Sequence, residues 1–110
     1  MNFFLIIIFL SLVEFVGDAS FRQYAKDPKL LDRLLLGILA YIGVVLILIQ
    51  SFKQANLIFT NGMWDGVSAA IGTILAVFIL NESLTNGYQW SGLTLVILGI
   101  ILLNIGKIPN

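Results

Sequence analysis

The chain has 110 residues, of which 59% are hydrophobic and 11% are charged, with six Lys and Arg residues balancing six Asp and Glu residues. Because a soluble globular domain is usually about one quarter charged, this composition indicates that much of the surface faces lipid. The lack of cysteine and histidine excludes disulfides, thiolate chemistry, imidazole catalysis and histidine-based metal sites, and the few basic residues form no nucleic-acid patch.

Four apolar stretches have roughly the 20 residues that a helix needs to cross a bilayer: residues 3–24, 34–52, 57–80 and 89–106. The first lacks a basic leader and a small-residue cleavage site, so we expect it to be retained. Short polar breaks separate the stretches, which predicts antiparallel neighbours. We expect an all-α membrane protein, a single four-helix transmembrane domain arranged as an up-down bundle, in a plasma or inner membrane.

The distribution of basic residues between the two sides is nearly even. The first predicted loop carries Arg22, Lys26, Lys29 and Arg33, whereas the opposite side carries Lys53 and Lys107. Positive charge marks the cytoplasmic side, so the first and third loops are predicted there by a small margin. Insertion in both orientations is also compatible with so weak a bias.

The first apolar stretch contains two acids, Glu14 and Asp18, one helical turn apart. On a helix they share a face with Ser11 and Arg22. An acid at the centre of a membrane helix costs about 3 kcal/mol, so this polar face should meet protein or a water-filled cavity.

Glu14 is the deeper of the two acids. Burial disfavours the charged form of a carboxylic acid, so we expect Glu14 to hold either a proton or a cationic ligand. Asp18 can instead stay ionised by pairing with Arg22, one turn further on. The alternative for both acids is a purely structural role in hydrogen bonds between helices.

The second and third stretches add further candidate residues. Asn61, Asp65, Ser68 and Gly72 fall on one face at helical spacing, and Trp64 borders that face, where an indole can stack on a cation. Small residues nearby allow close helix approach or leave space for a ligand. Tyr41 offers a hydroxyl at similar depth. For Asp65 an interfacial position near a helix start is an equal alternative, and for Tyr41 and Trp64 it is packing or anchoring.

The fourth stretch carries no acid, and its glycines recur every seven residues at Gly92, Gly99 and Gly106. Such a seam allows a second helix to come close. We therefore predict that this helix associates with another, within one chain or between two, and in a dimer we expect the interface at Gly92 and Gly99, with Asn104 adding a hydrogen bond. The alternative is that these glycines are scattered, as they often are in membrane helices.

Together these residues resemble the small multidrug resistance (SMR) family of the drug/metabolite transporter superfamily, over nearly the whole length. The matching features are Glu14 followed by Gly17 in "VEFVGDASFRQYA", Tyr41 in "LAYIGVVL", Trp64 and Gly66 in "NGMWDG", and Gly92, Gly99 and Asn104. The segment "LNESLTNGYQWSG" looks like the superfamily's glycine-glutamate-x-leucine-threonine loop, with Asn81 in place of the glycine.

The resemblance implies a proton-coupled antiporter that works as a dimer, commonly with its two subunits inserted in opposite orientations. Glu14 would bind protons or a cationic substrate, one at a time. Asp18 and Asp65 stand where the family usually has uncharged residues. They favour a substrate with more positive charge or more hydrogen-bond donors, such as a guanidinium compound or a polyamine.

These residues are compatible with several functions. The first is an antiporter, here expected as a homodimer, that exports small cations through Glu14. The second is a passive channel, although polar faces occur on only two stretches. A divergent transporter of lipid-linked or sugar substrates and an accessory subunit are further alternatives. We expect no enzyme, cofactor or metal site, because no nucleophile–base arrangement is present.

Overall fold

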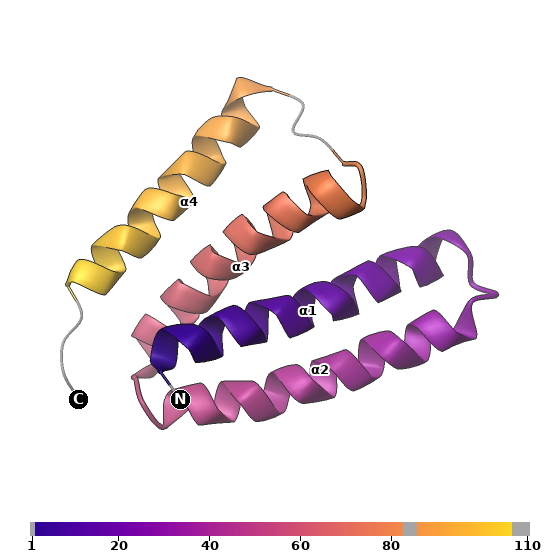
Figure 1. The fold of residues 1–110 in the computed structure, drawn as a ribbon, viewed down its shortest axis with the longest axis horizontal. Coiled ribbons are helices and arrows are strands. Elements are labelled where there is room, and N and C mark those ends of the chain that lie inside the picture. Colours follow the sequence, from indigo (N-terminus) through magenta and orange to yellow (C-terminus); the bar gives the residue numbers. More distant parts are fainter. Residues whose placement is uncertain (1, 83–85, 107–110) are drawn as a thin grey trace.

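The computed structural model describes residues 2–82 and 86–106, which form four α-helices (Figure 1). They are α1 (Phe3–Lys26), α2 (Leu31–Phe52), α3 (Leu57–Ile79) and α4 (Gly87–Ile105). Each is long and apolar enough to cross a membrane. This confirms the predicted all-α class with four helices of spanning length, and it fits a multi-pass integral membrane protein. The helices begin and end within three residues of the predicted stretches.

Asparagine side chains cap the N-termini of three of the four helices. Asn2 accepts a hydrogen bond from the Phe4 amide, Asn56 from the Phe59 amide and Asn86 from the Gln89 amide. An N-cap side chain of this kind satisfies a backbone donor that has no partner within the helix. The cap at Asn86 explains why α4 begins two residues before the predicted stretch.

The helices lie in the spatial order α2, α1, α3, α4, and consecutive helices run in opposite directions (Figure 1). Within the described residues α4 packs on α3 and contacts neither α1 nor α2. The principal extents are 48, 36 and 18 Å, so the chain forms an open, flattened row rather than a closed bundle. A helix that is apolar all round gains little by turning one face toward protein instead of lipid, which explains the position of α4.

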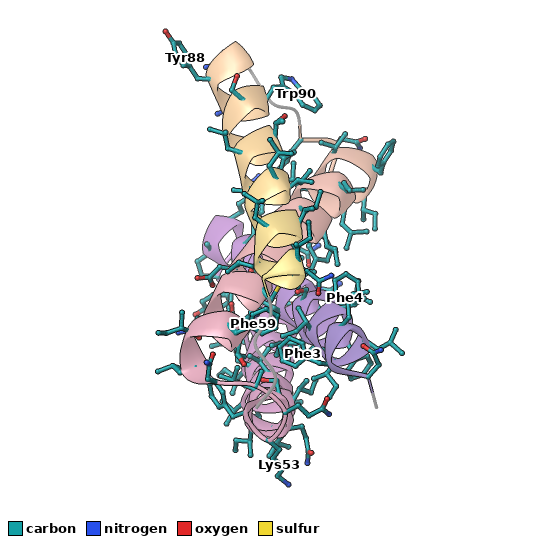
Figure 2. The ribbon with its side chains drawn as sticks, turned by 90° about the vertical axis from the view of Figure 1, so that its left-hand side faces the viewer. Phe3, Phe4, Lys53, Phe59, Tyr88 and Trp90 are labelled. Carbon is teal, nitrogen blue, oxygen red and sulfur yellow. The ribbon has the colours of Figure 1, made fainter. Side chains whose placement is uncertain are left out.

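The buried core lies between α1, α2 and α3, toward the end of the molecule where α1 and α3 begin. Its residues are Phe3, Ile7, Leu10, Val44, Ala55, Met63 and Val67. The rings of Phe3 and Phe59 pack with their centroids 5.3 Å apart, and both are visible in this region in Figure 2. In α4, which is described over its full length, no residue is buried.

Two glycines bring α1 and α2 into close contact through aromatic rings. Gly17 of α1 faces the ring of Tyr41 on α2, and Gly37 of α2 faces the ring of Phe21 on α1. The two rings pack on each other with centroids 5.6 Å apart. A Cβ at Gly37 would lie 2.4 Å from the Phe21 ring, so any side chain at this position would displace the ring. This contact fixes where Tyr41 lies relative to α1.

We predict that Gly37→Ala destabilises the chain by about 1–3 kcal/mol, because the added methyl group displaces the Phe21 ring and with it Tyr41. The free energy of unfolding in detergent micelles, followed by helical circular dichroism, measures this change. Gly72→Ala is the matched control, since the space around its Cβ position is open among the described residues. It should stabilise by up to about 1 kcal/mol through helix propensity. Equal effects of both substitutions would contradict the packing argument.

Candidate functional site

A groove of about 490 Å³ runs between α1 and α3, and its size suits a small molecule. Its charged and hydroxyl-bearing lining residues are Glu14, Asp18, Arg22, Asp65, Ser68, Thr73 and Glu82. On the α3 side, Ala69, Gly72 and Ala76 recur at helical spacing, and their small side chains leave space in the groove. The polar faces predicted on the first and third stretches therefore meet at one groove.

Glu14 is half-buried close to the midpoint of α1 and lines this groove. The Ser68 hydroxyl on α3 donates a hydrogen bond to its Oε1 atom. The carboxyl group thus takes a neutral donor from the neighbouring helix and faces the groove without a basic partner within the described residues. This bond also ties α1 to α3 at mid-helix.

Trp64 lies one turn before Ser68 on α3, and its indole borders the Glu14 carboxyl group closely enough to interact with it. Its Nε1 atom is nevertheless buried and makes no hydrogen bond within the described part of the chain. Trp64 is absent from the lining of the groove. The structure therefore places the indole behind Glu14 rather than on the open face.

Asp18 lies one turn beyond Glu14, is exposed to the groove and accepts a hydrogen bond from the Tyr41 hydroxyl. Arg22, considered from the sequence as a partner for Asp18, pairs instead with Glu82, with 2.7 Å between Arg22 Nε and Glu82 Oε2. The Arg22–Glu82 pair has no net charge and closes one end of the groove. Asp18 is therefore anchored by a neutral hydroxyl, as Glu14 is.

Asp65 lines the same groove from α3 and has no hydrogen-bond or ion-pair partner among the described residues. It also lines a second, mostly apolar groove of about 350 Å³ between α3 and α4, together with Gly66 and Gly99. Asp65 thus sits on the ridge that separates the two grooves. Its position at this shared edge could not be predicted from helical spacing alone.

The three carboxyl groups lie at successive levels along the groove. Asp65 is one turn before Ser68, whose hydroxyl reaches Glu14, and Asp18 is one turn after Glu14. Within residues 2–82 and 86–106, no three acidic side chains come close enough together to form a metal cluster. With Arg22 neutralised by Glu82, the open lining carries only negative charge when its acids are ionised, and such a surface concentrates cations.

The remaining predicted residues lie outside this groove. Asn61 is exposed and is not part of the lining. Gly92 and Gly99 face open space, with nothing in the described chain within 4 Å of a Cβ at either position. Asn104 lines a separate open cavity with Asn2, Phe3, Phe4 and Gln54. The close contact between α3 and α4 uses Gly62 and Gly66 instead, against Leu103 and Ile100.

Neither a scan against models of known protein families nor a search of curated proteins finds a match for this chain. The chemistry of the groove itself indicates what it can bind. It combines a carboxyl group at mid-helix, two further acids, neutral hydroxyl donors and a floor of small residues. Such a lining can bind a cation or a proton without covalent chemistry.

The closed end of the groove depends on how α3 terminates. Asn81 has a φ of 57°, the left-handed conformation that follows many helices. The Leu80 and Glu82 amides both donate to the Ala76 carbonyl oxygen, which completes the helix cap. This turn directs Glu82 back toward Arg22 on α1. In the superfamily loop that this segment resembles, glycine stands at the position of Asn81, and glycine favours the same left-handed backbone.

We predict that Asn81→Gly keeps or raises stability, whereas Asn81→Val lowers it by about 1–2 kcal/mol, because a β-branched residue resists a left-handed backbone. The free energy of unfolding in micelles measures both changes. Asn86→Gly is a useful comparison on the other side of the same connection, because it removes a side-chain cap without altering this turn. If valine were tolerated as well as glycine at position 81, the cap described here would be wrong.

Proposed function

We propose that this chain is a proton-coupled secondary transporter, an antiporter that exports small cationic compounds, in which proton and substrate compete for Glu14. The observation that carries the proposal is the surrounding of Glu14: a half-buried carboxyl group at mid-helix, held by the Ser68 hydroxyl and open to a groove. An ionisable group at this depth in a membrane helix is a functional candidate in its own right. The resemblance to SMR transporters supports the same role.

The competition follows from the local chemistry. A hydroxyl donor orients the carboxyl group but cannot neutralise it, so the charge is balanced either by a bound proton or by a cation in the groove. A resident arginine would abolish this exchange, and the nearest one, Arg22, is paired with Glu82. The groove thus favours one cationic occupant at a time beside Glu14.

Asp18 and Asp65 bear on the substrate class. Each faces the groove at a level different from that of Glu14. A compound with several donors or more than one positive charge, such as a guanidinium compound or a polyamine, can engage two levels at once. A compact monocation can engage only one. This arrangement supports the more highly charged class as substrate.

A dimer is part of the proposal. The groove of one chain is open and its row of helices is flat, so a second copy is needed to enclose a substrate and to alternate the access between two sides. The α4 face with Gly92 and Gly99 is open in the chain and suits such contact. Two subunits in opposite orientations agree with the weak charge bias.

We predict that Glu14→Gln inserts and folds but loses proton release on addition of a guanidinium or polyamine cation, and loses about 2–5 kcal/mol of binding free energy for it. Proton release from micelle-solubilised protein in weak buffer, together with calorimetry, measures both. Asp32→Asn is the matched control, because Asp32 is an exposed acid at the start of α2, away from the groove. A Glu14→Gln variant that exchanges protons and cations like the parent would refute the proposal.

Reconstituted vesicles test the same proposal against a channel. An antiporter should saturate with cation concentration and should move the cation against its gradient when a pH gradient is imposed. A current that neither saturates nor responds to the pH gradient would favour a passive pore instead.

We further predict that Gly92→Leu weakens dimerisation by about 1–3 kcal/mol, because a bulky side chain fills the seam by which the second helix approaches. Thr94→Leu adds a similar side chain on the opposite face of α4 and should leave dimerisation unchanged. Energy transfer between labelled chains at varied lipid-to-protein ratio measures the equilibrium. Equal dimerisation in both variants would place the interface elsewhere.

A further inference from the structure

Three buried polar atoms lie at the packed interface behind Glu14, outside the lining of the groove. They are Ser11 Oγ on α1 and Thr60 Oγ1 and Trp64 Nε1 on α3, and none has a hydrogen-bond partner among residues 2–82 and 86–106. Ser11 is 2% exposed and Thr60 is 0% exposed. A buried polar group without a partner costs a sizeable part of a protein's net stability. Three such atoms in one region therefore indicate that a small polar molecule binds them.

Four other hydroxyls of the described helices differ from those of Ser11 and Thr60. Ser20, Ser51, Thr73 and Thr94 each donate to a carbonyl oxygen of their own helix, at 2.7–2.9 Å. This local bond is the ordinary way for a helix to satisfy a hydroxyl away from water. Ser11 and Thr60 make no such bond among the described residues, so their hydroxyls are available to another partner.

The packing of α1 on α3 brings these atoms into one region. Both helices run in the same direction (Figure 1), and the bond from Ser68 to Glu14 sets their register. Ser11 precedes Glu14 by one turn and Trp64 precedes Ser68 by one turn, so both lie at the next level down. Thr60 lies one turn further. At the far end, the packed rings of Phe3 and Phe59 separate this region from the helix starts.

We infer that Ser11, Thr60 and Trp64 form an internal water site that adjoins Glu14 on the side away from the groove. Water fits the atoms present: an indole N–H only donates, the two hydroxyls can donate or accept, and none is charged. Buried waters typically make about three hydrogen bonds to otherwise unsatisfied groups. The neighbouring apolar residues Ile7, Leu10 and Met63 are buried as well, so the three polar atoms are shielded from lipid and from bulk water.

The site has a consequence for Glu14 that rests on the proposed function. A cation in the groove reaches Glu14 from the open side, between Asp18 and Asp65. Water beside Ser11 and Trp64 can take up the proton from Glu14 on that other side while the cation approaches. Proton and substrate can then exchange on Glu14 without occupying the same side of the carboxyl group.

The presence of this water can be measured without reference to transport. The chain has two tryptophans, so the indole N–H groups of ¹⁵N-tryptophan-labelled protein in lipid nanodiscs give two signals, which Trp90→Phe assigns. We expect magnetisation transfer from a long-lived water to the Trp64 indole. Trp90 is 57% exposed, so its indole signal reports on the surroundings of α4 and not on a buried water.

The double substitution Ser11→Ala with Thr60→Val tests which groups hold the water. It removes two of about three partners, so the transfer to Trp64 should fall by about twofold or more. Ser20→Ala with Ser51→Ala is the matched control, since both hydroxyls are buried but bonded within their own helices. It should leave the transfer unchanged.

Two results would overturn the inference: no transfer to Trp64 in the parent chain, or transfer that survives removal of both hydroxyls undiminished. The first of these needs no substitution, so the test stands even if the variant fails to fold. In vesicles, the double variant should exchange protons for cations several-fold more slowly at unchanged cation affinity. If the parent shows the water but exchanges no cation, the water site stands and the proposed function fails.

Discussion

The hydrogen bond between Ser68 and Glu14 is the interaction on which the arrangement of the site depends. It joins α1 to α3 at mid-helix, in surroundings where an unsatisfied carboxyl group would oppose insertion. Because the bond holds Glu14 at the interface, Asp18 and Asp65 fall at neighbouring levels of the same groove, and Ser11 and Trp64 fall behind it. The rest of the polar chemistry follows from this register.

Close packing between α1 and α2 provides the second constraint. The Gly17–Tyr41 and Gly37–Phe21 contacts leave no room for side chains larger than hydrogen at the two glycines, and the position of Tyr41 follows from them. Its hydroxyl then meets Asp18. The groove is thus bounded on one side by a closely packed helix pair. On the other side α3 carries small residues and ends in the Asn81 turn, which allows Glu82 to reach Arg22.

Helical periodicity was sufficient to predict the four helices and to place Glu14, Asp18, Asp65 and Ser68 on two polar faces, because apolar length and three- or four-residue spacing are local properties. Periodicity alone could not predict which partners these residues meet. The bonds of Asp18 with Tyr41 and of Arg22 with Glu82 join residues far apart in the sequence. Both depend on interhelical packing and on a turn conformation. The open arrangement of the four helices was not predicted for a similar reason. The sequence of a helix that is apolar all round does not indicate which helix it packs against.

The position of α4 separates two tasks within a small chain. None of its residues lines the groove between α1 and α3, and within the described chain it rests on α3 alone. Every group proposed to handle protons or cations therefore belongs to the first 82 residues, while the exposed glycine face belongs to the last helix. Except on the side of α4 that shares a groove with Asp65, substitutions can then accumulate on α4 and retune self-association without disturbing ligand chemistry, so that the two traits are free to evolve separately.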